Sequence, residues 1–140
     1  MYSALAKVPG IKFFVLSGNV TYLKPSDRPD EVLIPQDNTS ILLDVLAKSL
    51  SAKSASGITI IFNSVTDMVV TLGLEETYKF LRRVNELLSE TGAGGMFLLT
   101  PGAHDQKVVS VVRSLFSNQL ILGRSGGRIV KGQAVAPTGA

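Results

Sequence analysis

Hydrophobic residues change their spacing several times along the chain, and each change predicts a different element. Short continuous β-prone runs indicate four strands, at residues 11–16, 58–62, 96–99 and 120–122. The runs 58–62 and 96–99 are almost uninterrupted, which is typical of strands that are buried on both faces of a sheet. Residues 128–131 follow a glycine-rich turn, and we expect them to pair with 120–122 in a β-hairpin.

The spacing of apolar residues over 41–50 predicts the first helix, because it places them on one face. Thr39 or Ser40 is its expected N-cap, since short hydroxyl side chains accept hydrogen bonds from the first turn. The preceding stretch, residues 21–37, holds three prolines and is mostly polar. It therefore predicts a long irregular connection, of the kind that is often functional or mobile.

The clearest helical pattern covers residues 75–90, and Gly92 suits a left-handed C-cap just beyond it. Two i,i+4 ion pairs are expected on the surface of this helix, Glu75–Lys79 and Arg82–Glu86. A third helix is predicted from the wide apolar face that runs from residue 108 to 116, with His104 or Asp105 as its cap.

Alternation of strands and helices predicts an α/β fold, with a three-layer, mostly parallel sheet flanked by helices and a C-terminal β-hairpin. The chain has 140 residues, which fits one domain. We expect this domain to span residues 1–132, followed by a flexible tail over 133–140.

Ligands of parallel α/β sheets bind beyond the carboxyl ends of the strands, so the polar residues at those ends form the candidate site. This site consists of Ser17, Asn19, Asn63, Ser64, Asp67, Thr100, His104, Asp105 and Arg124. Asn63 follows an apolar strand at the position where a nucleotide hydrolase would carry a metal-binding acid. A neutral amide is a poorer Mg²⁺ ligand than a carboxylate, so hydrogen bonding within the loop is its alternative role.

Composition and motifs exclude several kinds of chemistry. The chain has no Cys and one His, which excludes disulfides, zinc–thiolate sites and multi-histidine metal sites. No P-loop occurs, and the glycine clusters at 92–95 and 123–127 fit a helix cap and a hairpin turn. The adjacent His104 and Asp105 suggest acid–base catalysis, but no serine elbow accompanies them, so helix capping is the alternative.

Charge adds one further hypothesis. The formal net charge of +3 is by itself too small to imply a nucleic-acid or membrane partner. Four basic residues nevertheless gather in the last third of the chain: Arg113, Arg124, Arg128 and Lys131. They form either a phosphate-binding patch or a solvated basic face, and no interleaved aromatic residues support base stacking.

Two stretches resemble a known family. Residues 11–16 and 58–67, followed by Leu-Gly-Leu-Glu-Glu-Thr-Tyr at 72–78, are similar to the later half of RecA-like ATPases of the archaeal KaiC type. Gly-Ala-His-Asp at 102–105 continues the likeness, which covers about residues 11–131. The resemblance implies that the P-loop unit and the strand with the family's catalytic glutamates would precede residue 11, and that Asn63 stands where the Walker B aspartate belongs. Losing these groups removes the phosphate stabilisation on which ATP hydrolysis depends.

The expected function is therefore that of a non-catalytic RecA/KaiC-like domain, an interaction or regulatory module with no cofactor of its own. Two alternatives stay open: an ATPase subunit whose ATP–Mg²⁺ site is completed by another chain, and nucleic-acid binding through the C-terminal hairpin.

Loss of the first strands would leave an exposed sheet edge, which predicts a homo-oligomer or a protein partner. Contact is expected through residues 21–37 or through that edge. No signal peptide and no apolar span of about 20 residues occurs, so a cytoplasmic location without a membrane partner is expected.

Overall fold

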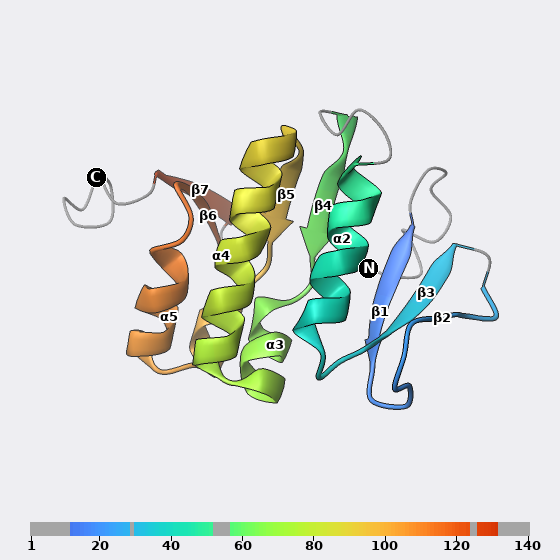
Figure 1. Cartoon of the computed structure of the whole chain (residues 1–140). Helices are drawn as coiled ribbons and strands as arrows, with labels where there is room; N and C mark the ends of the chain where they lie inside the picture. The colour runs from blue at the N-terminus through green and yellow to red at the C-terminus, as the bar shows by residue number, and fades with distance from the viewer. Residues whose placement is uncertain (1–11, 29, 52–56, 124–125, 132–140) are drawn as a thin grey trace. The chain divides into compact units, whose positions relative to one another are not determined.

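The computed structural model describes residues 12–28, 30–51, 57–123 and 126–131. The chain divides into two compact units, Met1–Lys53 and Ser54–Ala140, and each is described by itself. Strands and helices occur in both units, which confirms a mixed α/β protein (Figure 1). A single domain over residues 1–132 stays a prediction, and the predicted tail at 133–140 lies outside the described residues.

The first unit contains a three-stranded sheet in the order β1-β3-β2. Strands β1 (Phe13–Ser17) and β3 (Glu31–Pro35) are parallel, with Phe13 opposite Glu31 and Ser17 opposite Pro35. The short strand β2 (Lys24–Pro25) pairs with β3 in the antiparallel direction. The strand predicted at 11–16 is thus confirmed from Phe13 onward.

The prediction of an irregular connection over residues 21–37 is wrong, because β2 and β3 both lie within it. The side chain of Ile34 in β3 is fully buried. Two of the three prolines stand at strand ends, where proline does not interrupt a ladder of hydrogen bonds: Pro25 ends β2 and Pro35 ends β3. These two prolines therefore mark the ends of strands, whereas the sequence analysis took the prolines as a sign that no strand forms here.

Helix α2 (Thr39–Ser51) follows β3 and contacts it. Its buried residues are spaced four apart, as one face of a helix requires: Leu42, Leu46 and Leu50. The predicted N-cap is wrong by one residue, because Asn38 has this role. Its side-chain Oδ1 accepts a hydrogen bond from the backbone N–H of Ile41 at 3.2 Å.

The second unit is built on the parallel pair β4 (Thr59–Phe62) and β5 (Gly94–Phe97). Two helices connect these strands, α3 (Val65–Leu72) and α4 (Leu74–Thr91). Helix α4 confirms the prediction at 75–90 and buries one stripe of side chains: Thr77, Phe80, Leu81, Val84 and Leu88. Gly92 adopts the predicted left-handed conformation at its end, with φ of 76°.

One of the two predicted ion pairs on α4 is present. Lys79 Nζ lies 3.2 Å from Glu75 Oε1. Glu86 pairs with Arg83 at 2.6 Å and not with the predicted Arg82, so this contact spans three residues and not four. Both pairs are exposed, and such pairs contribute little to stability.

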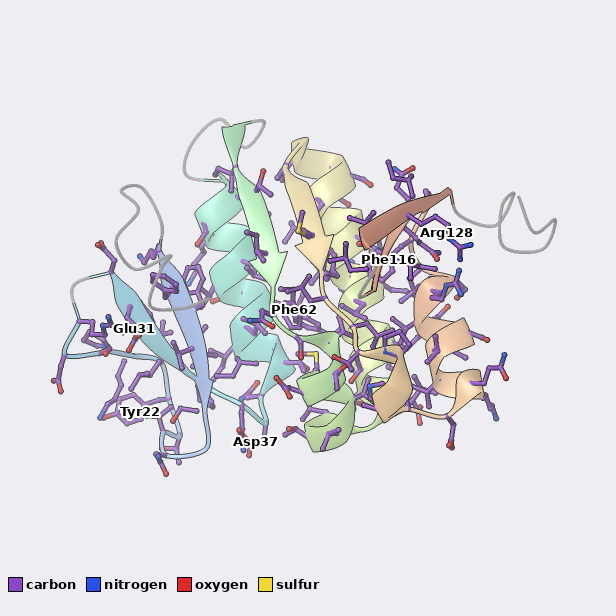
Figure 2. All side chains as sticks on the ribbon, turned by 180° about the vertical axis from the view of Figure 1, so that it is seen from behind. Tyr22, Glu31, Asp37, Phe62, Phe116 and Arg128 are labelled. Carbon is purple, nitrogen blue, oxygen red and sulfur yellow. The ribbon has the colours of Figure 1, made fainter. Side chains whose placement is uncertain are left out.

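Strands β4 and β5 are not buried on both faces, which corrects the prediction from their apolar runs. On one face the Phe62 ring packs against Phe80 of α4, with ring centroids 5.7 Å apart. On the other face Ile61 and Met96, which are opposite each other in the register, are 50 % and 55 % exposed. Seen from behind in Figure 2, no described helix of the second unit lies over this side of β4 and β5.

Helix α3 was not predicted. Its side chains Val65 and Met68 are buried, and Gly73 joins it to α4 with φ of 88° and ψ of 167°. The side chain of Thr77, which is fully buried, donates a hydrogen bond to the carbonyl oxygen of Gly73 at 2.7 Å. The chain therefore changes direction at Gly73, and the two helices pack against each other.

The last elements are the short helix η2 (Pro101–Ala103), α5 (Gln106–Arg113) and the antiparallel strands β6 (Asn118–Gly123) and β7 (Gly126–Lys131). The predicted hairpin is confirmed. Helix α5 ends at Arg113, so Phe116 lies beyond it, where its ring packs on Phe97 with centroids 4.9 Å apart. Among the described residues, no helix has both the length and the apolar character to cross a bilayer.

Candidate functional site

The carboxyl ends of β4 and β5 bring together several of the predicted site residues. Because the strands are parallel and Phe62 lies opposite Phe97, the segments that follow them meet at one edge. The Val65 N–H donates to the Leu98 carbonyl oxygen at 2.8 Å, and the Thr100 N–H donates to Thr66 Oγ1 at 2.8 Å. The start of α3 and the segment after β5 are thus held side by side.

Ser64 and Asp67 use their polar atoms on each other. Ser64 is the N-cap of α3: its Oγ accepts a hydrogen bond from the Asp67 N–H at 3.2 Å and donates one to Asp67 Oδ2 at 3.0 Å. The Ser64 hydroxyl therefore caps the helix, and the Asp67 carboxylate lies where the helix dipole favours negative charge. The exposed Asn63 precedes this cap, and the Asn63–Ser64 peptide bond is cis.

His104 and Asp105 lie next to each other in sequence, but no hydrogen bond or ion pair joins their side chains. His104 is partly buried, and its Nε2 atom is buried without a hydrogen-bond partner. Asp105 occupies the N-cap position of α5, as predicted, but its side chain makes no capping hydrogen bond. An acid–base pair requires the carboxylate to orient the imidazole, so this geometry does not support one.

No group of three or more His, Cys, Asp or Glu side chains that could hold a metal ion occurs in the described part of the chain. Asp67 is engaged by Ser64, and Asn63 contributes only a neutral amide. The edge is therefore polar and hydrogen-bonded, and its contacts are those of a structural junction.

Ser17 and Asn19 belong to the first unit, where the Asn19 N–H donates to Ser17 Oγ at 3.1 Å. Beside them lies a hollow of about 330 Å³ at the carboxyl ends of β1 and β3, which the sequence analysis missed. Its lining residues are Gly18, Val20, Thr21, Pro35, Gln36, Asp37 and Asn38. The Asp37 carboxylate in this lining, which includes no cation, makes the hollow unsuited to a phosphate group. Predicting β3 as a strand parallel to β1 would have indicated this hollow, because ligand sites lie beyond the carboxyl ends of parallel strands. Arg124 lies outside the described residues.

An exposed apolar surface on the hairpin was also missed. Leu120 lies opposite Ile129, and Leu122 lies opposite Gly127, so the four residues share one face of the two strands. The side chains of Leu120, Leu122 and Ile129 are 58 %, 74 % and 75 % exposed. Alternation of side chains along a strand places Leu120 and Leu122 on one face, a signal that the prediction of the strand 120–122 did not use.

Comparison with known protein families gives a match. The model of a family of unknown function, DUF7504, matches residues 37–121. No curated protein and no solved structure gives a significant match. The matched segment runs from the loop before α2 into β6 and includes the whole edge formed by β4 and β5. Because it covers more than half of the 140 residues, the chain belongs to the DUF7504 family.

Proposed function

We propose that this protein is a non-catalytic RecA/KaiC-like domain that binds another protein. The finer architecture belongs to this proposal: a mostly parallel sheet flanked by helices in three layers. Two observations support its parallel strands: the parallel pairing of β1 with β3, and the parallel pairing of β4 with β5 through helical connections. Helix α4 supplies a layer on one face of the second pair.

The contacts at the carboxyl ends of β4 and β5, where a nucleotide site would lie, support a structural role for this edge. A phosphate-transfer site needs a metal-binding carboxylate at the end of the strand and a cation that grips the phosphates. Here the strand β4 is followed by Asn63, and the nearest carboxylate in sequence, Asp67, caps α3 together with Ser64. These contacts occupy the groups from which a nucleotide site would have to be assembled.

The observation that carries the proposal is the exposed apolar surface of the β6–β7 hairpin. Three large aliphatic side chains on one face are more than half exposed, although each would be more stable out of water. Contiguous exposed apolar side chains on a folded domain mark interaction sites. Partner binding therefore explains a feature that enzymatic function leaves unexplained.

Titration of the purified chain with Mg²⁺–ATP in a calorimeter tests the non-catalytic part of the proposal. We expect no heat of binding and no release of phosphate in a parallel turnover assay. Hydrolysis by the wild-type chain that disappears in Asn63→Ala would overturn the proposal and favour a nucleotide site completed at this edge.

Cross-linking in cells tests the interaction part. We expect one partner to be cross-linked by the wild-type chain and by the control Val70→Asp, and to be lost with Leu122→Asp. Val70 on α3 and Leu122 are both 74 % exposed, so the two changes are matched in exposure. A chain that gains no specific partner, or that loses it equally with both substitutions, contradicts the proposal.

A further inference from the structure

The end of the chain carries a strongly uneven charge. All eleven Asp and Glu residues lie at or before Asp105, and every charged side chain after it is cationic: Lys107, Arg113, Arg124, Arg128 and Lys131. Among the described residues, Arg128 is exposed on β7 and has no ion pair (Figure 2). The hairpin therefore projects positive charge that no carboxylate of its own segment neutralises.

The two faces of the hairpin differ in chemistry. One face, which we call the hairpin face, consists of Leu120, Leu122, Gly127 and Ile129. The two leucines converge over the glycine: a Cβ atom at Gly127 would lie 2.9 Å from Leu122 Cδ2 and 3.4 Å from Leu120 Cδ1. Arg128, opposite Ile121, points to the other face because side chains alternate along a strand.

The hairpin also has backbone N–H and C=O groups that are available to pair with another strand. Strands β6 and β7 form a two-stranded sheet, so among the described residues each strand is paired along one edge only. An unpaired strand edge is a ready surface for an extended segment from another chain, and main-chain hydrogen bonds then supply affinity. Pockets and charges for alternate side chains supply the specificity.

From these three features, and resting on the proposed function, we propose that the hairpin binds an acidic, apolar segment of another protein as an added β-strand. The segment pairs along the free edge of β7, so its apolar residues extend the hairpin face beside Ile129. The alternate residues are Asp or Glu, and they lie on the opposite face beside Arg128. The partner is thus recognised by alternating aliphatic and acidic positions.

Charge argues against the other occupants. A second copy of the same hairpin would bring like charges together across the contact, since residues 118–131 hold three cations and no acid. Nucleic acid would satisfy the cations, but it would leave the three exposed aliphatic side chains in water. The hairpin strands contain no aromatic residue for stacking on bases.

Fluorescence anisotropy with a labelled peptide that alternates valine and glutamate tests the proposal on the full chain. We expect binding that weakens at least about tenfold with Ile129→Asp and at least about tenfold with Arg128→Glu. The matched controls Val70→Asp and Arg82→Glu, exposed positions on α3 and α4, are expected to leave it unchanged. Raising NaCl from about 50 to about 500 mM should weaken binding by the wild type and have less effect on Arg128→Glu.

Four outcomes would overturn the proposal. Two concern the peptide itself: no binding, or equal binding of a peptide with lysine in place of glutamate. The other two are displacement of the peptide by single-stranded DNA, and self-association of the chain through Leu122 that blocks the peptide. Each substituted side chain is exposed, so folding is expected to persist, and circular dichroism checks it. ATP turnover is measured separately, which keeps failure of this inference distinct from failure of the non-catalytic function.

Discussion

Arg113 and Gln119 are joined by two hydrogen bonds at the junction between α5 and β6. The Arg113 Nε–H donates to Gln119 Oε1 at 2.7 Å, and Gln119 Nε2 donates back to the Arg113 carbonyl oxygen at 3.1 Å and to that of Phe116 at 3.2 Å. One amide side chain thus satisfies the end of a helix and the first turn beyond it. This contact orients the hairpin that we propose to bind a partner.

The substitution Gln119→Ala is expected to remove these three hydrogen bonds and lower the free energy of unfolding by about 1–3 kcal/mol. Urea denaturation followed by circular dichroism measures the change. The control Gln106→Ala, at an exposed position in the first turn of α5, is expected to stay within about 0.5 kcal/mol of the wild type. Equal effects of the two substitutions would show that the junction contributes no stability.

Gly73 is required by the backbone between α3 and α4. Its φ of 88° and ψ of 167° lie in a region that only glycine adopts without strain. We expect Gly73→Ala to lower the free energy of unfolding by about 1–3 kcal/mol. Gly102→Ala is the control, because no atom lies within 4 Å of a Cβ there and its φ is not positive. A control that is as destabilised as Gly73→Ala would contradict this prediction.

Ser64 should behave as a helix cap and not as a catalytic residue. Ser64→Ala removes the acceptor for the Asp67 N–H and is expected to cost about 0.5–2 kcal/mol of stability. Ser64→Thr keeps the hydroxyl and should retain most of that stability. The exposed Ser89 on α4 provides the control, since Ser89→Ala should be neutral or slightly stabilising in a helix. An unchanged unfolding free energy for Ser64→Ala would refute the capping role.

The parts of the fold that the sequence predicted correctly are those with a strong local pattern. Helix α4 was predicted to within one residue at each end because its apolar stripe is long. Helix α3 was missed because most of its residues are β-branched, such as Val65, Thr66 and Val70, which favour strands. Its N-cap and its contact with α4 outweigh that preference.

Burial was harder to predict than secondary structure. An apolar run such as 58–62 shows that a strand forms, but whether one or both faces are covered depends on which elements pack against it. Ile61 and Met96 were expected to be buried and are half exposed. The hairpin face was missed for a different reason: a strand was predicted at 120–122 without assigning the face on which Leu120 and Leu122 lie.

The candidate site was predicted in part. Parallel pairing of two strands is enough to place Ser64, Asp67 and Thr100 at one edge, because consecutive strands of this kind end on the same side. The role of these side chains was not predictable, since the same residue types either bind a ligand or cap a helix. The hydrogen bonds between Ser64 and Asp67 show that Ser64 caps α3, and only the three-dimensional structure reveals them; the ligand-binding role stays a prediction.

Two adjacent glycines of β5 should respond to alanine with opposite signs. A Cβ at Gly95 would lie 2.6 Å from Leu88 Cδ1 and 2.9 Å from Phe97 Cε1. The Leu88 side chain is buried, and the Phe97 ring is held between the rings of Phe62 and Phe116, so neither can move freely. Gly95→Ala is therefore expected to lower the free energy of unfolding by about 1–3 kcal/mol.

At Gly94 the nearest atom to such a Cβ is Thr59 Oγ1 at 3.4 Å, which is an ordinary contact. Neither glycine has a positive φ, so the backbone tolerates alanine at both positions. Gly94→Ala should gain about 0.4–1 kcal/mol, because alanine restricts the unfolded chain more than glycine does. Urea denaturation of the two variants compares them directly. Stabilisation by both substitutions would mean that β5 does not approach α4 as closely as the structure places it.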